Sequence, residues 1–77
     1  MYFVYLLLCK DNSIYTGITN DLERRLEQHK TGTASRYTRA RGVRRLLYSE
    51  KQPGRSEALK REAQIKRLPR EKKLDLI

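Results

Sequence analysis

The sequence feature that most constrains the fold is an eight-residue apolar run, Tyr2 to Cys9, near the start of an otherwise polar chain. The run is too short for a membrane span or an independent helix, and its β-branched and aromatic beginning favours a buried β-strand. The turn-forming residues 11–13 follow it, and extended character resumes over 14–18, where Gly17 permits close backbone approach. Together these segments predict a β-hairpin.

A helix is predicted directly after the hairpin. Asn20 or Asp21 can cap it, and Leu22 and Leu26 repeat at the i, i+4 spacing of a helix face. The sequence Thr-Gly-Thr at 31–33 breaks the pattern, so the helix is expected to end there.

The second half of the chain is predicted to hold one strand and two helices. Residues 34–42 have no clear period and allow one short turn, and 43–51 are expected to form a third strand. A strong helix-forming segment covers 56–67 and is stopped by Pro69, after which 70–77 can form a last short helix. The order ββαβαα, with a hairpin first, predicts an α+β fold: a small three-stranded antiparallel sheet flanked by helices.

Length and charge narrow the functional class. The 77 residues allow a single domain over 1–77, with a thin core. Lys and Arg number 18 against 9 Asp and Glu, giving a net charge of +9 that makes nucleic acid the first expected partner. Cys9 and His29 are the only residues of their kinds, which excludes a disulfide or a Cys/His zinc cluster within one chain and suits a reducing, cytoplasmic setting. No membrane association and no particular oligomeric state are indicated.

Helical phase separates the two adjacent arginines of the first helix. Arg25 and His29 border the stripe formed by Leu22 and Leu26, whereas Arg24 points to the opposite side. Only Arg25 is therefore expected to face the sheet. In the alternative interpretation Arg25 and His29 merely lay their stems along the edge of the core.

Helical phase also selects one carboxylate on the helix over 56–67. The buried face is expected to be formed by Ala58, Leu59, Ala63, Ile65 and Lys66. Glu62 falls inside this face, whereas Glu57 faces solvent. A buried carboxylate needs a partner, a metal or a cleft, so Glu62 is the candidate for chemistry, with an ion pair to Lys66 as the alternative.

An arginine-rich tract follows the first helix. It places five arginines within ten residues around one aromatic side chain, which suits phosphate contacts and base stacking. The alternative is a solvated loop with no partner. The candidate nucleic-acid-binding residues are Arg36, Tyr37, Arg39, Arg41, Arg44 and Arg45.

The spacing of these candidates resembles the GIY-YIG nuclease superfamily, and most closely its small stand-alone bacterial members. The carrying residues are the triplet Phe3-Val4-Tyr5, the triplet Tyr15-Thr16-Gly17, then Arg25 and His29, and later the helical Glu62. Phe3, Val4 and Thr16 depart from the residues that name the superfamily, while both tyrosines and the glycine remain. The likeness covers essentially the whole chain.

The resemblance implies a metal-dependent endonuclease that hydrolyses phosphodiester bonds in nucleic acid, with DNA as the first expected substrate and RNA as the alternative. Glu62 would hold one Mg²⁺ or Mn²⁺, and Arg25 would grip a phosphate oxygen. Tyr5 or Tyr15, in concert with His29, would accept the proton of the attacking water. The alternative is a nucleic-acid-binding module that uses the same basic surface without cutting, or cuts only with a partner. An interaction domain built on the last two helices is least favoured because of the high charge.

Overall fold

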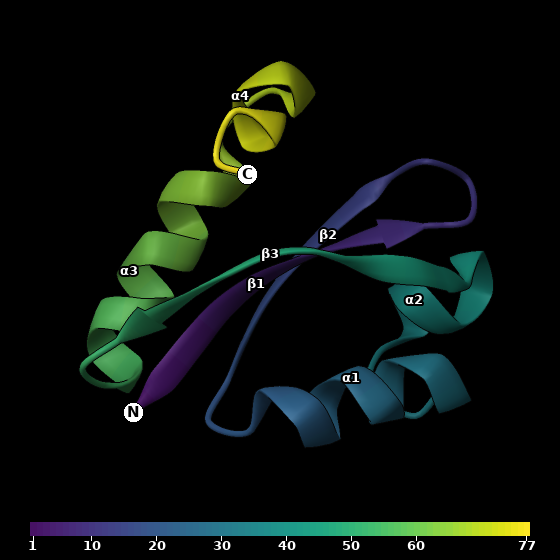
Figure 1. Cartoon of the computed structure of the whole chain (residues 1–77), viewed down its shortest axis with the longest axis horizontal. Helices are drawn as coiled ribbons and strands as arrows, with labels where there is room; N and C mark the ends of the chain where they lie inside the picture. The colour runs from purple at the N-terminus through teal and green to yellow at the C-terminus, as the bar shows by residue number, and fades with distance from the viewer.

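A computed structural model describes all residues, 1–77, as a three-stranded antiparallel sheet with four helices. In chain order the elements are β1 (Tyr2–Cys9), β2 (Ile14–Thr19), α1 (Leu22–Thr31), α2 (Arg36–Arg41), β3 (Val43–Gln52), α3 (Arg55–Lys66) and α4 (Arg70–Leu74) (Figure 1). The predicted α+β class, antiparallel sheet and order ββαβαα are confirmed, with α2 as an additional short helix. None of the helices combines the length and apolarity needed to cross a lipid bilayer.

The segment 34–42, for which the sequence predicts one short turn, forms the six-residue helix α2. Its start is fixed by Ser35, whose side chain accepts a hydrogen bond from the backbone N–H of Thr38 at 3.2 Å. Gly42 ends it with a φ of 74°. A capping serine and a terminating glycine thus make a helix from a segment whose polar residues carry no helical period.

β1 is the central strand, in the order β2-β1-β3, because it is apolar on both sides. Val4, Tyr5, Leu6 and Leu7 are successive along it, and each is at most 1% exposed. Tyr5 pairs with Gly17 of β2, and Leu6 pairs with Thr16. Since paired residues point to the same side of a sheet and successive residues alternate, these two pairs mark its two faces.

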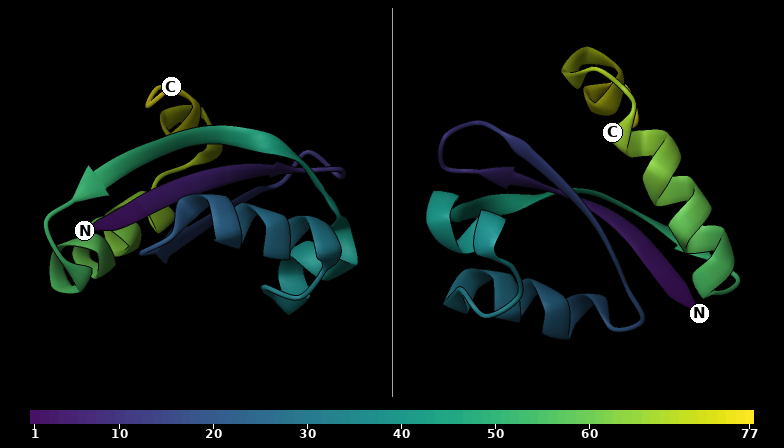
Figure 2. Two further views of the ribbon diagram at one scale, coloured as in Figure 1. Left: turned by 60° about the horizontal axis from the view of Figure 1, so that its bottom comes forward. Right: turned by 180° about the vertical axis from the view of Figure 1, so that it is seen from behind.

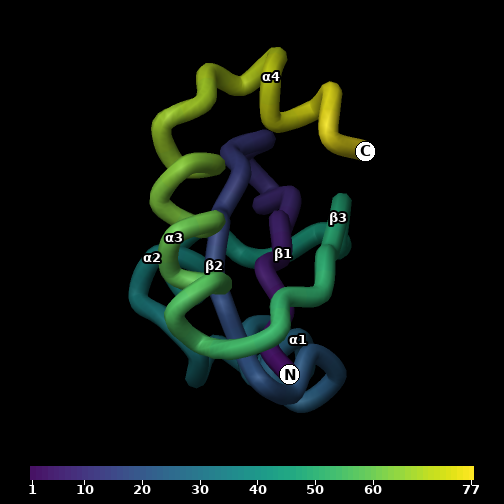
Figure 3. The backbone as a smooth tube through the Cα atoms, turned by 90° about the vertical axis from the view of Figure 1, so that its left-hand side faces the viewer, coloured from purple at the N-terminus to yellow at the C-terminus, as the bar shows by residue number.

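One side of the sheet, called here the core face, carries the apolar core under α3. Its centre is formed by Val4, Leu6, Ala58 and Ile65, all fully buried. α3 contacts all three strands and runs beside β2, as the side view in Figure 3 shows. Burial of this apolar cluster is the main force that attaches α3 to the sheet.

The buried side of α3 differs from the predicted one. Ala58 and Ile65 are fully buried, with the half-buried Glu62 between them at helical spacing. Leu59 is 40% exposed, and Ala63 and Lys66 are exposed as well, so their predicted burial is wrong. The small side chain of Ala58, rather than the larger Leu59, lies in the core contact with Val4 and Leu6.

The other side of the sheet, called here the site face, is covered by α1 and α2. Figure 1 and the right-hand view of Figure 2 show this helix pair on a different side of the strands from α3 and α4. The one buried residue of α1 is His29, and the one buried residue of α2 is Thr38. The helices of the site face therefore turn polar groups inward, beside Tyr5.

Candidate active site

Tyr5 lies at the centre of the site face. Its side chain is 1% exposed, and its hydroxyl is 2.8 Å from Nε2 of His29 in α1. A Cβ atom placed on Gly17, its neighbour on β2, would stand 2.5 Å from Oη of Tyr5. The missing side chain at Gly17 is therefore what lets the Tyr5 hydroxyl lie over β2.

The contact between Tyr5 and His29 continues into α2. Nδ1 of His29 lies 2.8 Å from Oγ1 of Thr38, which is 1% exposed. Oγ1 of Thr38 in turn lies 2.9 Å from Oγ of Ser35. Four side chains, Tyr5, His29, Thr38 and Ser35, thus form one hydrogen-bonded chain, called here the relay.

Burial keeps both ring-bearing members of the relay uncharged. Desolvation raises the pKa of Tyr5 well above that of an ordinary phenol, the Tyr15 and Glu62 charges act in the same direction, and Arg25 opposes them. Desolvation and then the Arg25 charge lower the pKa of His29 below 6.5. At neutral pH a protonated phenol therefore meets a neutral imidazole, in which one nitrogen donates a hydrogen bond and the other accepts one.

The same electrostatics connect the relay with the two charged candidates. Arg25 is half-buried on α1 while the adjacent Arg24 is exposed, as helical phase predicts. The Arg25 charge acts on both Tyr5 and His29, and the Glu62 charge reaches Tyr5 from α3. Positive and negative groups from opposite sides of the sheet thus influence one phenol.

α3 is held in position by a charged cluster next to Glu62. Nε of Arg61 lies 3.0 Å from Oε2 of Glu50 on β3, and Tyr48 and Gln52 also donate hydrogen bonds to this carboxylate. Burial acts to raise the pKa of Glu50, but the hydrogen bonds from Tyr48, Arg61 and Gln52 outweigh it and lower the pKa. The ionised pair adds a polar contact between α3 and β3 at the position next to Glu62.

Tyr15 extends the site towards solvent. Its partly exposed ring lies 5.2 Å from the His29 ring and 6.4 Å from the Tyr5 ring, measured between centroids. On another side it lies 5.6 Å from the ring of Tyr37. Unlike Tyr5, Tyr15 is not part of the relay.

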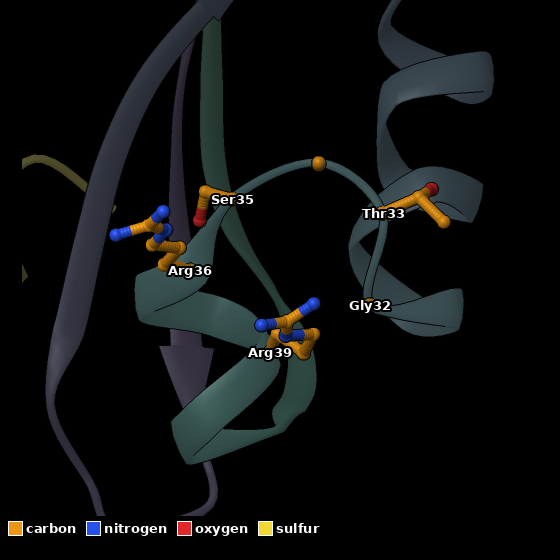
Figure 4. A pocket seen from close by; sticks show the side chains of 6 residues that line it. Gly32, Thr33, Ser35, Arg36 and Arg39 are labelled. Atoms are coloured by element: carbon orange, nitrogen blue, oxygen red, sulfur yellow. The ribbon is translucent and has the colours of Figure 1, made fainter.

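The arginine-rich tract does not form one surface. Arg41 binds Asp11 at 2.5 Å and lies 4.3 Å above the Tyr37 ring, and Arg44 donates to Asn12 at 3.2 Å. These two arginines hold the turn between β1 and β2, while Arg45 is exposed on β3. Arg36 and Arg39 instead line an open hollow beside Gly32, Thr33 and Ser35, as Figure 4 shows.

The donor set of the site fits a hard divalent cation. Three or more His, Cys, Asp or Glu side chains that could hold a metal between them are not found together. Mg²⁺ is commonly held by one or two carboxylates, with substrate phosphates and water completing its shell. The Glu62 carboxylate, 18% exposed and already 3.5 Å from Nζ of Lys66, suits that role, because the lysine is 57% exposed and can turn away.

Sequence reasoning missed Ser35 and Thr38. Serine is a favoured residue at the start of a helix, so Ser35 could have been recognised as a cap, but no comparable signal marks Thr38. The burial of Thr38 against His29 depends on how α2 docks on α1, and the local sequence does not contain that information.

Comparison with known proteins shows similarity to one protein family. A protein-family model described as "GIY-YIG catalytic domain" matches residues 1–75. A UPF0213 protein of Oceanobacillus iheyensis is 51% identical over 99% of this chain and 88% of its own length. A UPF0213 protein of Xanthomonas axonopodis pv. citri is 52% identical over 92% of this chain and 70% of its own length.

Solved structures give the same result. The solution NMR structure of the protein EF2693 from E. faecalis has a TM-score of 0.65 and 44% identity, covering 96% of this chain and 79% of that one. The solution NMR structure of a UPF0213 protein from Bacillus halodurans has a TM-score of 0.60 and 44% identity, covering 99% and 82%. The fold of this chain is thus similar to that of experimentally determined relatives.

Proposed function

Because the chain belongs to the GIY-YIG catalytic domain family, a family of nucleases, we propose that it is a metal-dependent endonuclease that hydrolyses phosphodiester bonds in nucleic acid, with DNA as the expected substrate. The observation that supports this most is the gathering of Tyr5, Tyr15, Arg25, His29 and Glu62, from four different elements, around one buried phenol. Tyr5, Tyr15 and His29 are in direct contact, and the charges of Arg25 and Glu62 act on the Tyr5 hydroxyl from two helices.

Arg25 is assigned to the phosphate. Its guanidinium is permanently charged and fork-shaped, which matches the non-bridging oxygens of a phosphodiester and opposes the charge that develops on them. Glu62 would hold one Mg²⁺ or Mn²⁺, which when bound supplies a Lewis acid for the phosphate and its leaving oxygen. Glu62 also directs negative charge at Tyr5, and a bound cation would offset that charge.

Tyr15 is assigned as the group that takes the proton of the attacking water. Tyr5 is poorly suited, because burial raises its pKa and its hydroxyl is already bound to His29. Tyr15 is partly exposed, and its ring lies edge-on to His29, with 62° between the ring planes. Tyr5 and His29 then orient Tyr15 and exclude water from the inner side of the site.

A cleavage assay tests the proposal. Labelled single-stranded, duplex and branched DNA and RNA are incubated with Mg²⁺, Mn²⁺ or EDTA, using the wild type, Glu62→Ala and Arg25→Ala. Products should require the metal, and Arg25→Ala should lower turnover by about 10²–10³-fold, the usual effect of removing one group that stabilises transition-state charge. Arg24→Ala and Glu57→Ala are matched controls on the exposed sides of the same helices and should cut normally.

Two outcomes would reject parts of the proposal. Metal-dependent cutting that persists in Glu62→Ala would remove the metal assignment. Tight, salt-sensitive binding without cutting under any condition would instead identify the domain as a nucleic-acid-binding module. Tyr15→Phe should lower turnover more than Tyr5→Phe, and the reverse order would exchange the roles of the two tyrosines.

A further inference from the structure

Two open hollows lie next to each other on the outside of α1 and α2. The first has a volume of about 410 Å³, lies between the end of α1 and the start of α2, and includes Gly32, Arg36 and Arg39 in its wall. The second, of about 280 Å³, lies between the ends of α1, α2 and β1, and its wall also contains Gly32 and Arg39. The two hollows are therefore neighbours on either side of Gly32 and Arg39, and the pair is called here the basic groove.

The walls of the basic groove carry positive charge only. Lys10, Lys30, Arg36 and Arg39 line it, and no Asp or Glu does. None of these four side chains belongs to the ion pairs of the chain, which join Arg41 to Asp11, Arg61 to Glu50 and Lys66 to Glu62. The groove therefore contains cations whose charge is not neutralised within the protein.

The remaining wall of the groove is polar and suits an anion with several oxygens. Each hollow has a single hydrophobic lining residue, so neither suits an apolar ligand. The hydroxyls of Thr31 and Thr33 already donate to the backbone carbonyl of Gln28, so the guanidinium forks of Arg36 and Arg39 are the groups that match phosphate oxygens. In contrast, the smaller hollow beside Arg25 includes the carboxylate of Asp21.

The inner end of the basic groove meets the relay. His29 and Thr38 both line the second hollow, and His29 binds the Tyr5 hydroxyl. Ser35, at the other end of the relay, lines the first hollow. A chain of phosphates lying in the groove would therefore pass beside His29, whose Nε2 lies 2.8 Å from the Tyr5 hydroxyl, while Arg25 lies at the separate third hollow.

We propose that the basic groove binds the sugar–phosphate backbone of the nucleic-acid strand next to the bond that is cut, with Arg36 and Arg39 as its main phosphate contacts; this rests on the proposed function for the nature of the strand. Lys10 and Lys30 add charge along the second hollow. Arg41 and Arg44 are excluded, because Asp11 and Asn12 already hold them. The arginine-rich tract is thereby divided into a binding pair and a structural pair.

The test measures binding of labelled single-stranded and duplex oligonucleotides of DNA to the full chain by fluorescence anisotropy, in EDTA, over a range of salt concentrations. The variant is Arg36→Gln with Arg39→Gln. The control, Arg55→Gln with Arg67→Gln, removes the same charge from two exposed positions, the first residue of α3 and the residue that directly follows this helix. All proteins are first shown to have the same thermal midpoint.

Loss of two phosphate contacts should lower the slope of log K against log salt by about 1.8 for duplex and about 1.4 for single-stranded DNA. The control pair should leave the slope nearly unchanged. An equal decrease of the slope in both variants would overturn the proposal that the groove binds the backbone, because binding would then depend on net charge alone. Effective competition by inorganic phosphate at millimolar concentration would overturn it as well, since the groove would then be a site for a single ion.

Binding and cutting separate the two proposals. If the slope falls only in the groove variant while the wild type never cuts, the groove is supported and the nuclease proposal fails. If the wild type cuts and the groove variant binds with an unchanged slope, the groove is rejected and the nuclease proposal stands.

Discussion

The two faces of the sheet bury different chemistry. On the core face the fully buried side chains are apolar, and Leu6 packs with Ile65 of α3. On the site face Tyr5, His29 and Thr38 are buried as completely but are joined by hydrogen bonds. Apolar contacts tolerate small shifts, whereas a hydrogen bond weakens steeply when its geometry changes. Changes on the core face should therefore act on stability alone, whereas changes on the site face should also disturb the geometry of the hydrogen bonds and turnover.

Among the changes that compare the two faces, Gly17→Ala should have the largest effect and should act on turnover. The new Cβ atom would stand 2.5 Å from Oη and 2.7 Å from Cζ of Tyr5, so the phenol must move away from His29. Displacement of this size can lower a rate by about 10²-fold. The rate of cleavage and the NMR shifts of the His29 ring would measure both consequences.

Gly54→Ala is the matched control for this substitution. Gly54 also has an extended backbone, with a φ of −155°, but lies at the start of α3, where its nearest contact would be Glu57 at 3.0 Å. It should leave the His29 shifts and turnover unchanged. Normal turnover in Gly17→Ala would show that the position of Tyr5 does not limit cleavage.

Thr38→Val should destabilise the fold by about 1–3 kcal/mol, because it leaves Nδ1 of buried His29 without a partner. Thr38→Ser keeps the hydroxyl and should restore most of the loss. Chemical denaturation measures the stability, and NMR of the His29 ring nitrogens reports the tautomer. A valine variant as stable as the wild type, with unchanged nitrogen shifts, would show that the relay ends at His29.

Thr16→Val, on the core face, should stabilise the fold, in contrast to Thr38→Val. Thr16 pairs with Leu6, is 4% exposed, and its hydroxyl is the one buried side-chain polar atom without a hydrogen-bond partner. Removing this hydroxyl at nearly constant shape should stabilise the fold by about 1 kcal/mol. The same denaturation experiment measures the change, and destabilisation would contradict the assigned difference between the faces.

The smallest predicted effect is a pH dependence of stability in two windows. The pKa of His29 is lowered below 6.5 by burial and by Arg25, so below pH 6.5 the unfolded state binds more protons and stability falls as the pH decreases. The pKa of Asp11 is lowered from 3.8 to about 2 by hydrogen bonds from Ser13 and then by Arg41, so its contribution is present above pH 3.8 and is lost towards pH 2. Thermal midpoints from pH 8 to 2 should show both decreases.

His29→Gln identifies the upper window of this pH profile. The decrease that begins near pH 6.5 should disappear in the variant, while the decrease below pH 3.8 remains. An unchanged upper decrease would mean that another group causes it.

The hairpin and α1 could be predicted from sequence because their signals are local. The run from Tyr2 to Cys9 matches β1 at both ends, and the choice between Asn20 and Asp21 as the cap of α1 is settled in favour of Asp21, which accepts from the backbone N–H of Arg24. The inward position of Arg25 follows from helical phase for the same reason. Short-range patterns suffice where one side chain or one turn determines the outcome.

The remaining features depend on contacts between distant segments. Leu59 is the most hydrophobic residue of its turn, yet α3 buries Ala58 instead, and Arg61 adds a polar contact with Glu50 of β3. The burial of Thr38 likewise depends on His29, nine positions away. A helical wheel shows the residues of one helix only. It therefore could not predict which residues of α3 face the sheet or that Thr38 is buried against His29.

The two glycines that flank α2 make this helix a separable unit. Gly32 and Gly42 have φ values of 80° and 74°, in the left-handed region, so the chain changes direction where glycine is favoured. Between them, Ser35 and Thr38 face the relay while Arg36 and Arg39 face the groove. The outward arginines of the nine-residue segment 33–41 can therefore change without changing the inward pair or the sheet beneath it.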